Sequence, residues 1–158
     1  MIPQIGVIGA CICDTELQEI AEEVGYAIAR SGAFLICGGL GGVMEASARG
    51  AKKAGGTTIG ILPGDSRLSP NPYIDIAILS NMGHARNAII AQSCDALIAV
   101  GGEYGTLSEI ALSLKMGKTV ITLDSKWNIE GTIKAASALE AVEMAFCAAG
   151  SKQDSSCF

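Results

Sequence analysis

The stretch DALIAVGGEYGTLSE, residues 95–109, decides the fold. It reads as an apolar strand at 95–100, a glycine-rich turn, and a helix that begins near residue 106. In this arrangement the unpaired N–H groups at the start of the helix point at a ligand, and the helix dipole attracts negative charge. Glycine allows positive φ and a close approach of the ligand to the backbone. The stretch therefore predicts a phosphate-binding turn.

A second glycine-rich turn, GGLGG at 38–42, follows the apolar run AFLIC at 33–37 and opens another helix. If both strands belong to one parallel sheet, both turns lie at its carboxyl edge and face one crevice, where open α/β sheets bind ligands. We expect that crevice to take a phosphate. The expected binding residues from the strand ends and turns are Gly9, Gly38, Gly39, Gly41, Gly42, Gly101, Gly102, Gly105 and Thr106.

Apolar strands alternate with helical segments along the chain. Several strands are continuous apolar runs, which indicates a mostly parallel sheet covered on both faces. The pattern is typical of an α/β, Rossmann-like, doubly wound sheet of six to seven strands with helices on both faces, with a 3-2-1 core and a switch point beside strand one. We expect a single nucleotide-binding domain at 1–150 and a flexible tail at 151–158. The expected strands are 4–9, 33–37, 57–62, 75–79, 95–100 and 119–123, and the expected helices are about 16–30, 42–54, 83–93, 106–116 and 130–148.

Composition limits the partners. The net charge is −5, with 16 acidic and 11 basic residues, which argues against nucleic-acid binding. No apolar run is long enough to span a membrane, and the N-terminus lacks a signal-peptide pattern, so we expect a cytoplasmic protein. Six cysteines without a C-x-x-C pair, and one histidine, predict reduced thiols and no metal site, although the role of Cys11 and Cys13 stays open.

Two common phosphate-binding motifs are excluded. The first turn reads GACICD, without the G-x-G-x-x-G fingerprint, and the second strand ends in Cys37 where an acidic residue would hold a ribose. The P-loop-like Gly117-Lys118-Thr119 lies between a helix and a strand, which is the wrong order. A nucleotide or a phosphorylated pterin fits the remaining two turns, and no further cofactor is expected to be required.

Three elements together resemble the LOG-type proteins, some of which were long mislabelled as lysine decarboxylases. GGEYGTLSE at 101–109 resembles their PGGxGTxxE signature, CGGLGGVME at 37–45 resembles their earlier glycine loop, and Met82 with Arg86 resembles their M-x-x-R-K element. The similarity covers about residues 2–146. LOG enzymes are phosphoribohydrolases that cut the N-glycosidic bond of nucleoside 5′-monophosphates. The resemblance implies Met82 and Arg86 as ligand contacts, Arg86 and Glu109 as catalytic residues if the chain is a hydrolase, and no lysine decarboxylase activity.

The departures from that signature point to a related branch. Val100 replaces the proline that opens it, Glu103 or Tyr104 is an extra residue in the turn, and Asn87 stands in place of lysine. These features resemble a compact branch of the same superfamily that includes the molybdenum cofactor carrier proteins, which bind rather than cleave. We therefore expect a binding protein for a nucleotide or molybdopterin-type ligand, with a phosphoribohydrolase as the alternative. The resemblance also implies a homo-oligomer, a dimer or tetramer.

Plain structural roles compete with these functional ones. Thr106-x-x-Glu109 matches a capping box, in which Glu109 would reach back to the start of its helix. Arg86 could form a surface ion pair instead of donating two hydrogen bonds to a phosphate. His84 is expected to be a capping or surface residue more often than a ligand contact, and Asp14 or Thr15 is expected to cap the first helix. The stripe Ile133, Leu139, Val142, Ala145 and Phe146 is expected to be core or a subunit contact.

Overall fold

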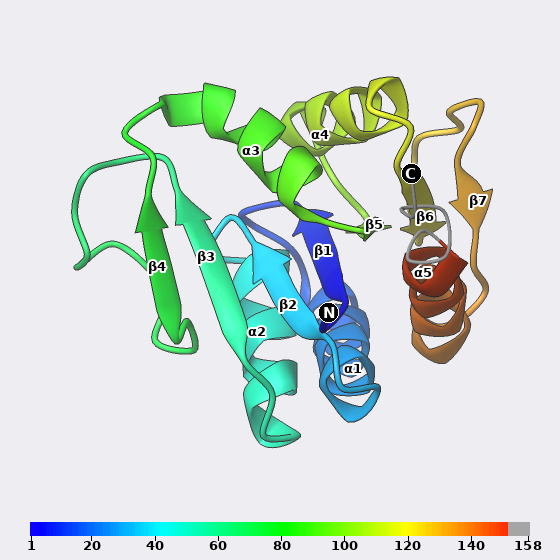
Figure 1. The fold of residues 1–158 in the computed structure, drawn as a ribbon, viewed down its shortest axis with the longest axis horizontal. Coiled ribbons are helices and arrows are strands. Elements are labelled where there is room, and N and C mark those ends of the chain that lie inside the picture. The colour runs from blue at the N-terminus through cyan, green and yellow to red at the C-terminus, as the bar shows by residue number, and fades with distance from the viewer. Residues whose placement is uncertain (152–158) are drawn as a thin grey trace.

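The computed structural model describes residues 1–151. Its centre is one sheet of seven strands, all parallel, in the order β4-β3-β2-β1-β5-β6-β7 (Figure 1). The predicted doubly wound sheet is confirmed, with the order reversing between β1 and β5. The strands are β1 Gln4–Gly9, β2 Phe34–Cys37, β3 Thr58–Leu62, β4 Ile76–Leu79, β5 Ala96–Val100, β6 Thr119–Leu123 and β7 Ile133–Lys134.

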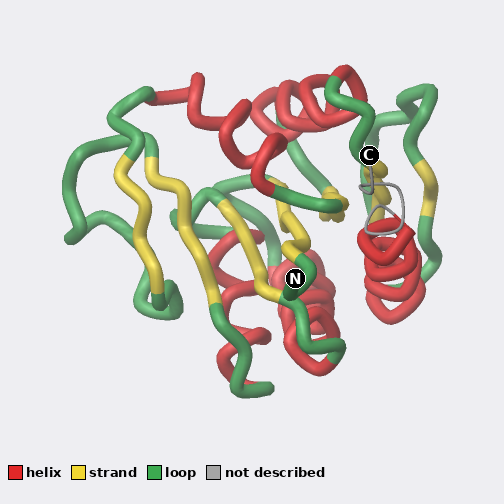
Figure 2. Tube along the Cα trace, viewed as in Figure 1, coloured by secondary structure: helices red, strands yellow, loops and turns green. Residues whose placement is uncertain are grey.

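Helices cover both faces of the sheet (Figures 1 and 2). One apolar core joins the sheet to α1, α2 and α5, and a second joins its other face to α3 and α4. Along β1 the side chains alternate between these cores, since Ile5 and Val7 belong to the first and Ile8 to the second. The helices are α1 Thr15–Arg30, α2 Val43–Lys53, the short 3₁₀ helix η1 Gly83–Ala85, α3 Arg86–Ser93, α4 Tyr104–Lys115 and α5 Ala138–Ser151.

Asp14 caps α1, as one of the two capping alternatives predicts. Its carboxylate accepts a hydrogen bond from the N–H of Leu17 at 2.9 Å. This bond satisfies one of the N–H groups that a helix start leaves unpaired. Asp14 is therefore explained without a ligand.

The single helix predicted over 130–148 is wrong for residues 130–137. Residues 133–134 form the edge strand β7 instead, and α5 begins only at Ala138. Ser137 starts this helix, because its carbonyl oxygen accepts from the N–H of Ala141 and its hydroxyl from the N–H of Glu140.

This change of element divides the predicted apolar stripe. Val142 and Ala145 are buried in the core beneath α5, whereas Leu139 is 62% exposed. Ile133, now on the edge strand, is 45% exposed and Phe146 is 36% exposed. The stripe is thus partly core and partly surface.

The predicted tail, 151–158, lies outside the described residues except for Ser151, the last residue of α5. No helix within the described part of the chain is long and apolar enough to cross a membrane.

Candidate functional site

A pocket of about 520 Å³ opens at the carboxyl edge of the sheet, where the strand order reverses. It is formed by the turns after β1, β2 and β5 together with the start of α3. The structure thus brings the two predicted glycine turns and the Arg86 segment together. Five of the predicted site residues line the pocket: Gly9, Arg86, Gly105, Thr106 and Glu109.

The remaining predicted site residues do not line this pocket. Met82, four residues before Arg86, has a side chain that is 52% exposed outside it. Two of the glycines among them, Gly38 and Gly42, position pocket residues, as described below. These residues are Gly38, Gly39, Gly41, Gly42, Gly101, Gly102 and Met82.

Arg86 is the central cation of the pocket and is only 8% exposed. Its Nη1 donates to the carbonyl oxygen of Gly38 at 2.5 Å and also to the carbonyl oxygen of Ile61. These bonds fasten the guanidinium to the ends of β2 and β3. Nη2 and Nε have no hydrogen-bond partner among residues 1–151, and no ion pair forms there. The surface ion pair considered for Arg86 is therefore absent from the described structure, and a fixed, partly unsatisfied cation faces the pocket.

The guanidinium of Arg86 fills the space that a side chain at position 38 would need, so only glycine fits there. A Cβ at this position would lie 2.5 Å from Nη1 of Arg86 and 2.7 Å from Sδ of Met44. Any larger residue would push Arg86 out of place. The glycine thus acts on the ligand site through the position of Arg86.

The helices α2 and α4 both begin at the pocket. Met44, in the first turn of α2, and Gly105 and Thr106, in the first turn of α4, line it. Within the described residues, the backbone N–H groups of these three residues and of Glu45 have no hydrogen-bond partner. Two helix starts with unpaired N–H groups converge on one pocket, and this is a favourable environment for an anion.

Gly42 lets the turn after β1 lie directly against the start of α2. It takes a φ of 62°, and a Cβ there would lie 2.2 Å from the carbonyl oxygen of Ala10. The same oxygen accepts a hydrogen bond from the N–H of Val43 at 3.0 Å. The glycine and this bond fix residues 10 and 11 at the pocket mouth.

Glu109 is not part of a capping box, so that alternative is wrong. Helix α4 begins at Tyr104, with Glu103 in extended conformation before it, and no side chain caps the helix. Thr106 is therefore the third helical residue and Glu109 lies in the second turn, too far along to reach the cap. The carboxyl group of Glu109 instead lines the pocket.

Burial gives Glu109 unusual acid–base properties. The side chain is 8% exposed, and burial raises the pKa of its carboxyl group to about 7, although the positive charge of Arg86 opposes the shift. Burial also lowers the pKa of Arg86, and the negative charge of Glu109 partly offsets this. A carboxyl group that titrates near neutral pH can donate or accept a proton at a ligand.

Three buried polar side chains of the pocket lack partners. Asn87, Thr106 and Glu109 are all less than a tenth exposed, and no hydrogen bond to their side chains exists within residues 1–151. Their polar atoms are not among the fully buried unpaired atoms of the described residues, which are Oγ1 of Thr122 and Nε1 of Trp127, so they face the open pocket and not the core. A bound polar ligand would supply the missing partners.

Sequence reasoning missed several lining residues. Asn87 was noted only as a departure from a family motif, and Cys11 only as half of a C-x-C pair. Leu40 and Met44 gave no functional signal, because nothing in an apolar residue distinguishes a pocket wall from a core. His84, for which a structural role was favoured, is exposed and lines the pocket.

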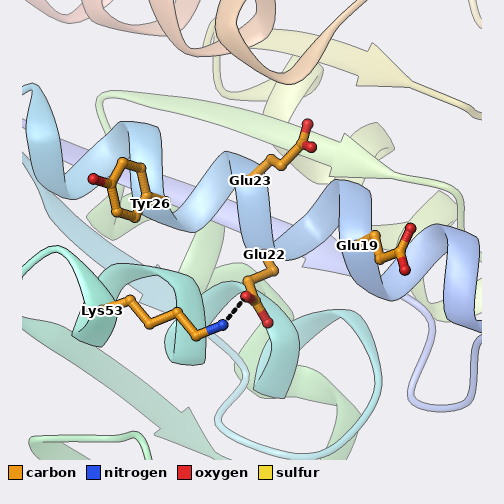
Figure 3. A pocket seen from close by; sticks show the side chains of 5 residues that line it. All are labelled: Glu19, Glu22, Glu23, Tyr26 and Lys53. Carbon is orange, nitrogen blue, oxygen red and sulfur yellow. Dashed lines mark hydrogen bonds and ion pairs between the residues drawn. The ribbon is translucent and has the colours of Figure 1, made fainter.

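A second hollow, of about 350 Å³, lies on the outer surface of α1 and α2 (Figure 3). Its cation, Lys53, is neutralised by an ion pair with Glu22, which also binds Arg49. Glu19 and Glu23 point away from this pair. Because carboxylates dominate the hollow, an anionic ligand would be repelled there, and the pocket around Arg86 is the candidate site.

Comparison with known proteins places the chain in a family. The profile of the SLOG cluster 4 family matches residues 2–151. The chain belongs to this family. A protein of Archaeoglobus fulgidus is 59% identical over 128 residues, which are 81% of this chain and 84% of the relative.

Solved structures are similar over most of the chain. The molybdenum cofactor binding protein of Rippkaea orientalis is 38% identical, with a TM-score of 0.87 over 91% of this chain and 95% of that one. The molybdenum cofactor carrier protein of Chlamydomonas reinhardtii is 35% identical, with a TM-score of 0.88 over 95% and 99% of the two chains. The compact LOG-like branch expected from the sequence is confirmed.

More distant relatives match in part. A cytokinin riboside 5′-monophosphate phosphoribohydrolase of Rhodococcoides fascians is 35% identical over 60% of this chain, and the match spans half the length of that enzyme. DNA processing protein A of Streptococcus pneumoniae shares 19% identity at a TM-score of 0.71, a likeness that shows the fold alone. Within residues 1–151, no group of three or more His, Cys, Asp or Glu side chains could hold a metal ion.

Proposed function

We propose that this protein binds a phosphate-bearing small molecule, either a nucleotide or a molybdopterin-type cofactor, in the pocket around Arg86, and serves as its carrier. One observation carries the proposal: the buried guanidinium of Arg86 and the open starts of α2 and α4 meet in one pocket. Charge-assisted hydrogen bonds from Arg and backbone N–H groups at helix starts are the usual ligands of phosphate in proteins.

The carrier role is supported by the extent of the relationship. The two structures described as molybdenum cofactor binding or carrier proteins match more than nine-tenths of this chain at 35–38% identity. The phosphoribohydrolase relative matches only 60% of it. The phosphate end of a pterin cofactor would lie at Arg86, and the pocket needs no additional resident cofactor to hold it.

A phosphoribohydrolase activity is the second candidate, because Glu109 and Arg86 occupy one pocket. A carboxyl group with a pKa of about 7 could activate water, or stabilise the positive charge that develops on a ribose as its N-glycosidic bond breaks. Arg86 would hold the 5′-phosphate of the nucleotide. Lysine decarboxylation has no support from this arrangement.

Binding and hydrolysis can be separated with one panel of ligands. Purified protein is titrated calorimetrically with AMP, with metal-free molybdopterin and with adenosine, and each mixture is then assayed for free base. We expect binding of both phosphorylated molecules, adenosine at least tenfold weaker than AMP, and no release of adenine. Equal affinity for adenosine and AMP would contradict the phosphate site, whereas release of adenine from AMP would select the hydrolase.

We further propose that the protein is a cytoplasmic homo-oligomer, a dimer or tetramer, that associates through α3 and α4. These helices pack against each other over one sheet face. The edge strand β4 exposes the further apolar residues Ile76 and Ile78. Sedimentation would give the number of subunits.

A further inference from the structure

Cys11 places a thiol in the ligand pocket. The residue is exposed, it follows β1 at the mouth of the pocket, and it lies close enough to Arg86 for the two side chains to interact electrostatically. Its thiol has no hydrogen-bond partner among the described residues. Cys11 is therefore directed at the same space as the guanidinium.

The backbone that carries this thiol is held in position. The carbonyl group of Cys11 rests on Gly42, where a Cβ would come within 2.5 Å of its oxygen. The preceding carbonyl, of Ala10, accepts the hydrogen bond from Val43 at the start of α2. A ligand whose phosphate is bound at the start of α2 would thus meet a thiol that is carried on a fixed stretch of backbone.

The other thiol near Arg86, that of Cys37, is buried in the core and cannot contact a ligand. Cys37 is fully buried, its Sγ accepts from the N–H of Gly39 at 3.3 Å, and burial raises its pKa to about 11. Cys13 is half-buried against the core and does not line the pocket. Of these three thiols, only that of Cys11 is available to a ligand.

Independent groups in the pocket also indicate a ligand beside Cys11. Asn87, Thr106 and Glu109 are more than nine-tenths buried, line the same pocket and lack partners among residues 1–151. Their donors and acceptors suit the polar edge of either a pterin or a purine, so they do not by themselves choose between the two ligands. Cys11 is different, because thiolate sulfur is a soft donor that prefers soft or borderline metal centres to the hard oxygen and nitrogen atoms of a nucleotide.

We infer that Sγ of Cys11 coordinates the metal of a metal-bearing pterin phosphate bound in this pocket, and so selects that ligand over a nucleotide. The inference rests on the proposed carrier function. Cys11 would supply one thiolate sulfur ligand after its thiol has lost a proton to solvent, in exchange for one solvent-derived ligand and with no change in oxidation state. Arg86 and the helix starts hold the phosphate end of the same molecule.

Three probes test the inference under anaerobic conditions: molybdenum cofactor, its metal-free pterin and AMP. Cys11→Ser should weaken binding of the molybdenum-containing probe by about tenfold or more, and change binding of the other two less than twofold. Cys13→Ser is the matched control and should leave all three affinities unchanged. Molybdenum K-edge absorption spectra should show one sulfur neighbour fewer in the Cys11→Ser complex than in the wild-type complex.

The outcomes separate this inference from the carrier proposal. If the wild-type protein binds all three probes and Cys11→Ser weakens none of them, or weakens all three equally, coordination by Cys11 is wrong and the phosphate site stands. An unchanged sulfur count would overturn it in the same way. If the wild-type protein binds none of the probes, the carrier function and this inference both fail.

Discussion

Replacing Arg86 with Gln will weaken AMP binding by about 10- to 100-fold, because charge-assisted hydrogen bonds contribute about 1.5–3 kcal/mol and each 1.4 kcal/mol is a factor of ten. Nη2 and Nε are available to the phosphate, while Nη1 is held by the carbonyl groups of Gly38 and Ile61. Isothermal titration calorimetry measures the change in Kd. Glutamine keeps a polar side chain, but it lacks the positive charge of arginine and the paired N–H donors of the guanidinium group.

Two controls identify the cause of this loss. Arg67→Gln removes the same charge from an exposed loop residue outside the pocket and should leave the Kd unchanged. Arg86→Lys keeps the charge without the planar fork and should fall between the wild type and Arg86→Gln. Because Arg86 also ties β2 to β3, circular dichroism must show that each variant is folded. Wild-type affinity in a folded Arg86→Gln protein would show that Arg86 does not bind the phosphate.

Replacing Glu109 with Gln will stabilise the ligand-free protein at pH 8 and hardly change it near pH 4.5. The pKa of Glu109 is raised to about 7 in the folded state, so the folded protein binds more protons than the unfolded chain between about pH 4.5 and pH 7. Stability therefore falls as the pH rises through this interval, by a total on the order of 3 kcal/mol. Glutamine has no such titration, and urea unfolding at the two pH values measures the difference.

The matched control for this variant is Glu19→Gln, which alters an exposed carboxyl group on α1. It should show no gain of stability at pH 8. A loss of stability for Glu109→Gln at both pH values would mean that Glu109 supports the fold rather than the pocket. If the wild-type protein does release base from AMP, Glu109→Gln should abolish the release and still bind AMP.

The sequence predicted the sheet well, because each central strand is a continuous apolar run bounded by glycine or a polar residue. It failed where local patterns were ambiguous. The apolar stripe through Ile133 and Leu139 suggested one helix, but Ile133 pairs with β6 as part of β7, and Ser137, three residues after the end of β7, starts α5. The Thr106–Glu109 spacing suggested a cap, but α4 begins two residues earlier than predicted.

The site was predicted in outline and not in detail, for a physical reason. A glycine in the sequence indicates that a side chain is excluded, but not what excludes it. At Gly38 it is Arg86 and at Gly42 it is the backbone of Ala10 and Cys11, whereas Gly9 and Gly105 lie on the pocket surface itself. Asn87 and Cys11 join the site through contacts between distant segments, which local spacing does not reveal.

The most direct test of the phosphate site is a crystal structure of the protein saturated with AMP. We predict phosphate oxygens within about 2.7–3.2 Å of the N–H groups of Gly105 and Thr106 and of the Arg86 guanidinium. A phosphate bound elsewhere, such as in the hollow of Figure 3, or a pocket around Arg86 that stays empty of AMP at saturation, would contradict the phosphate site.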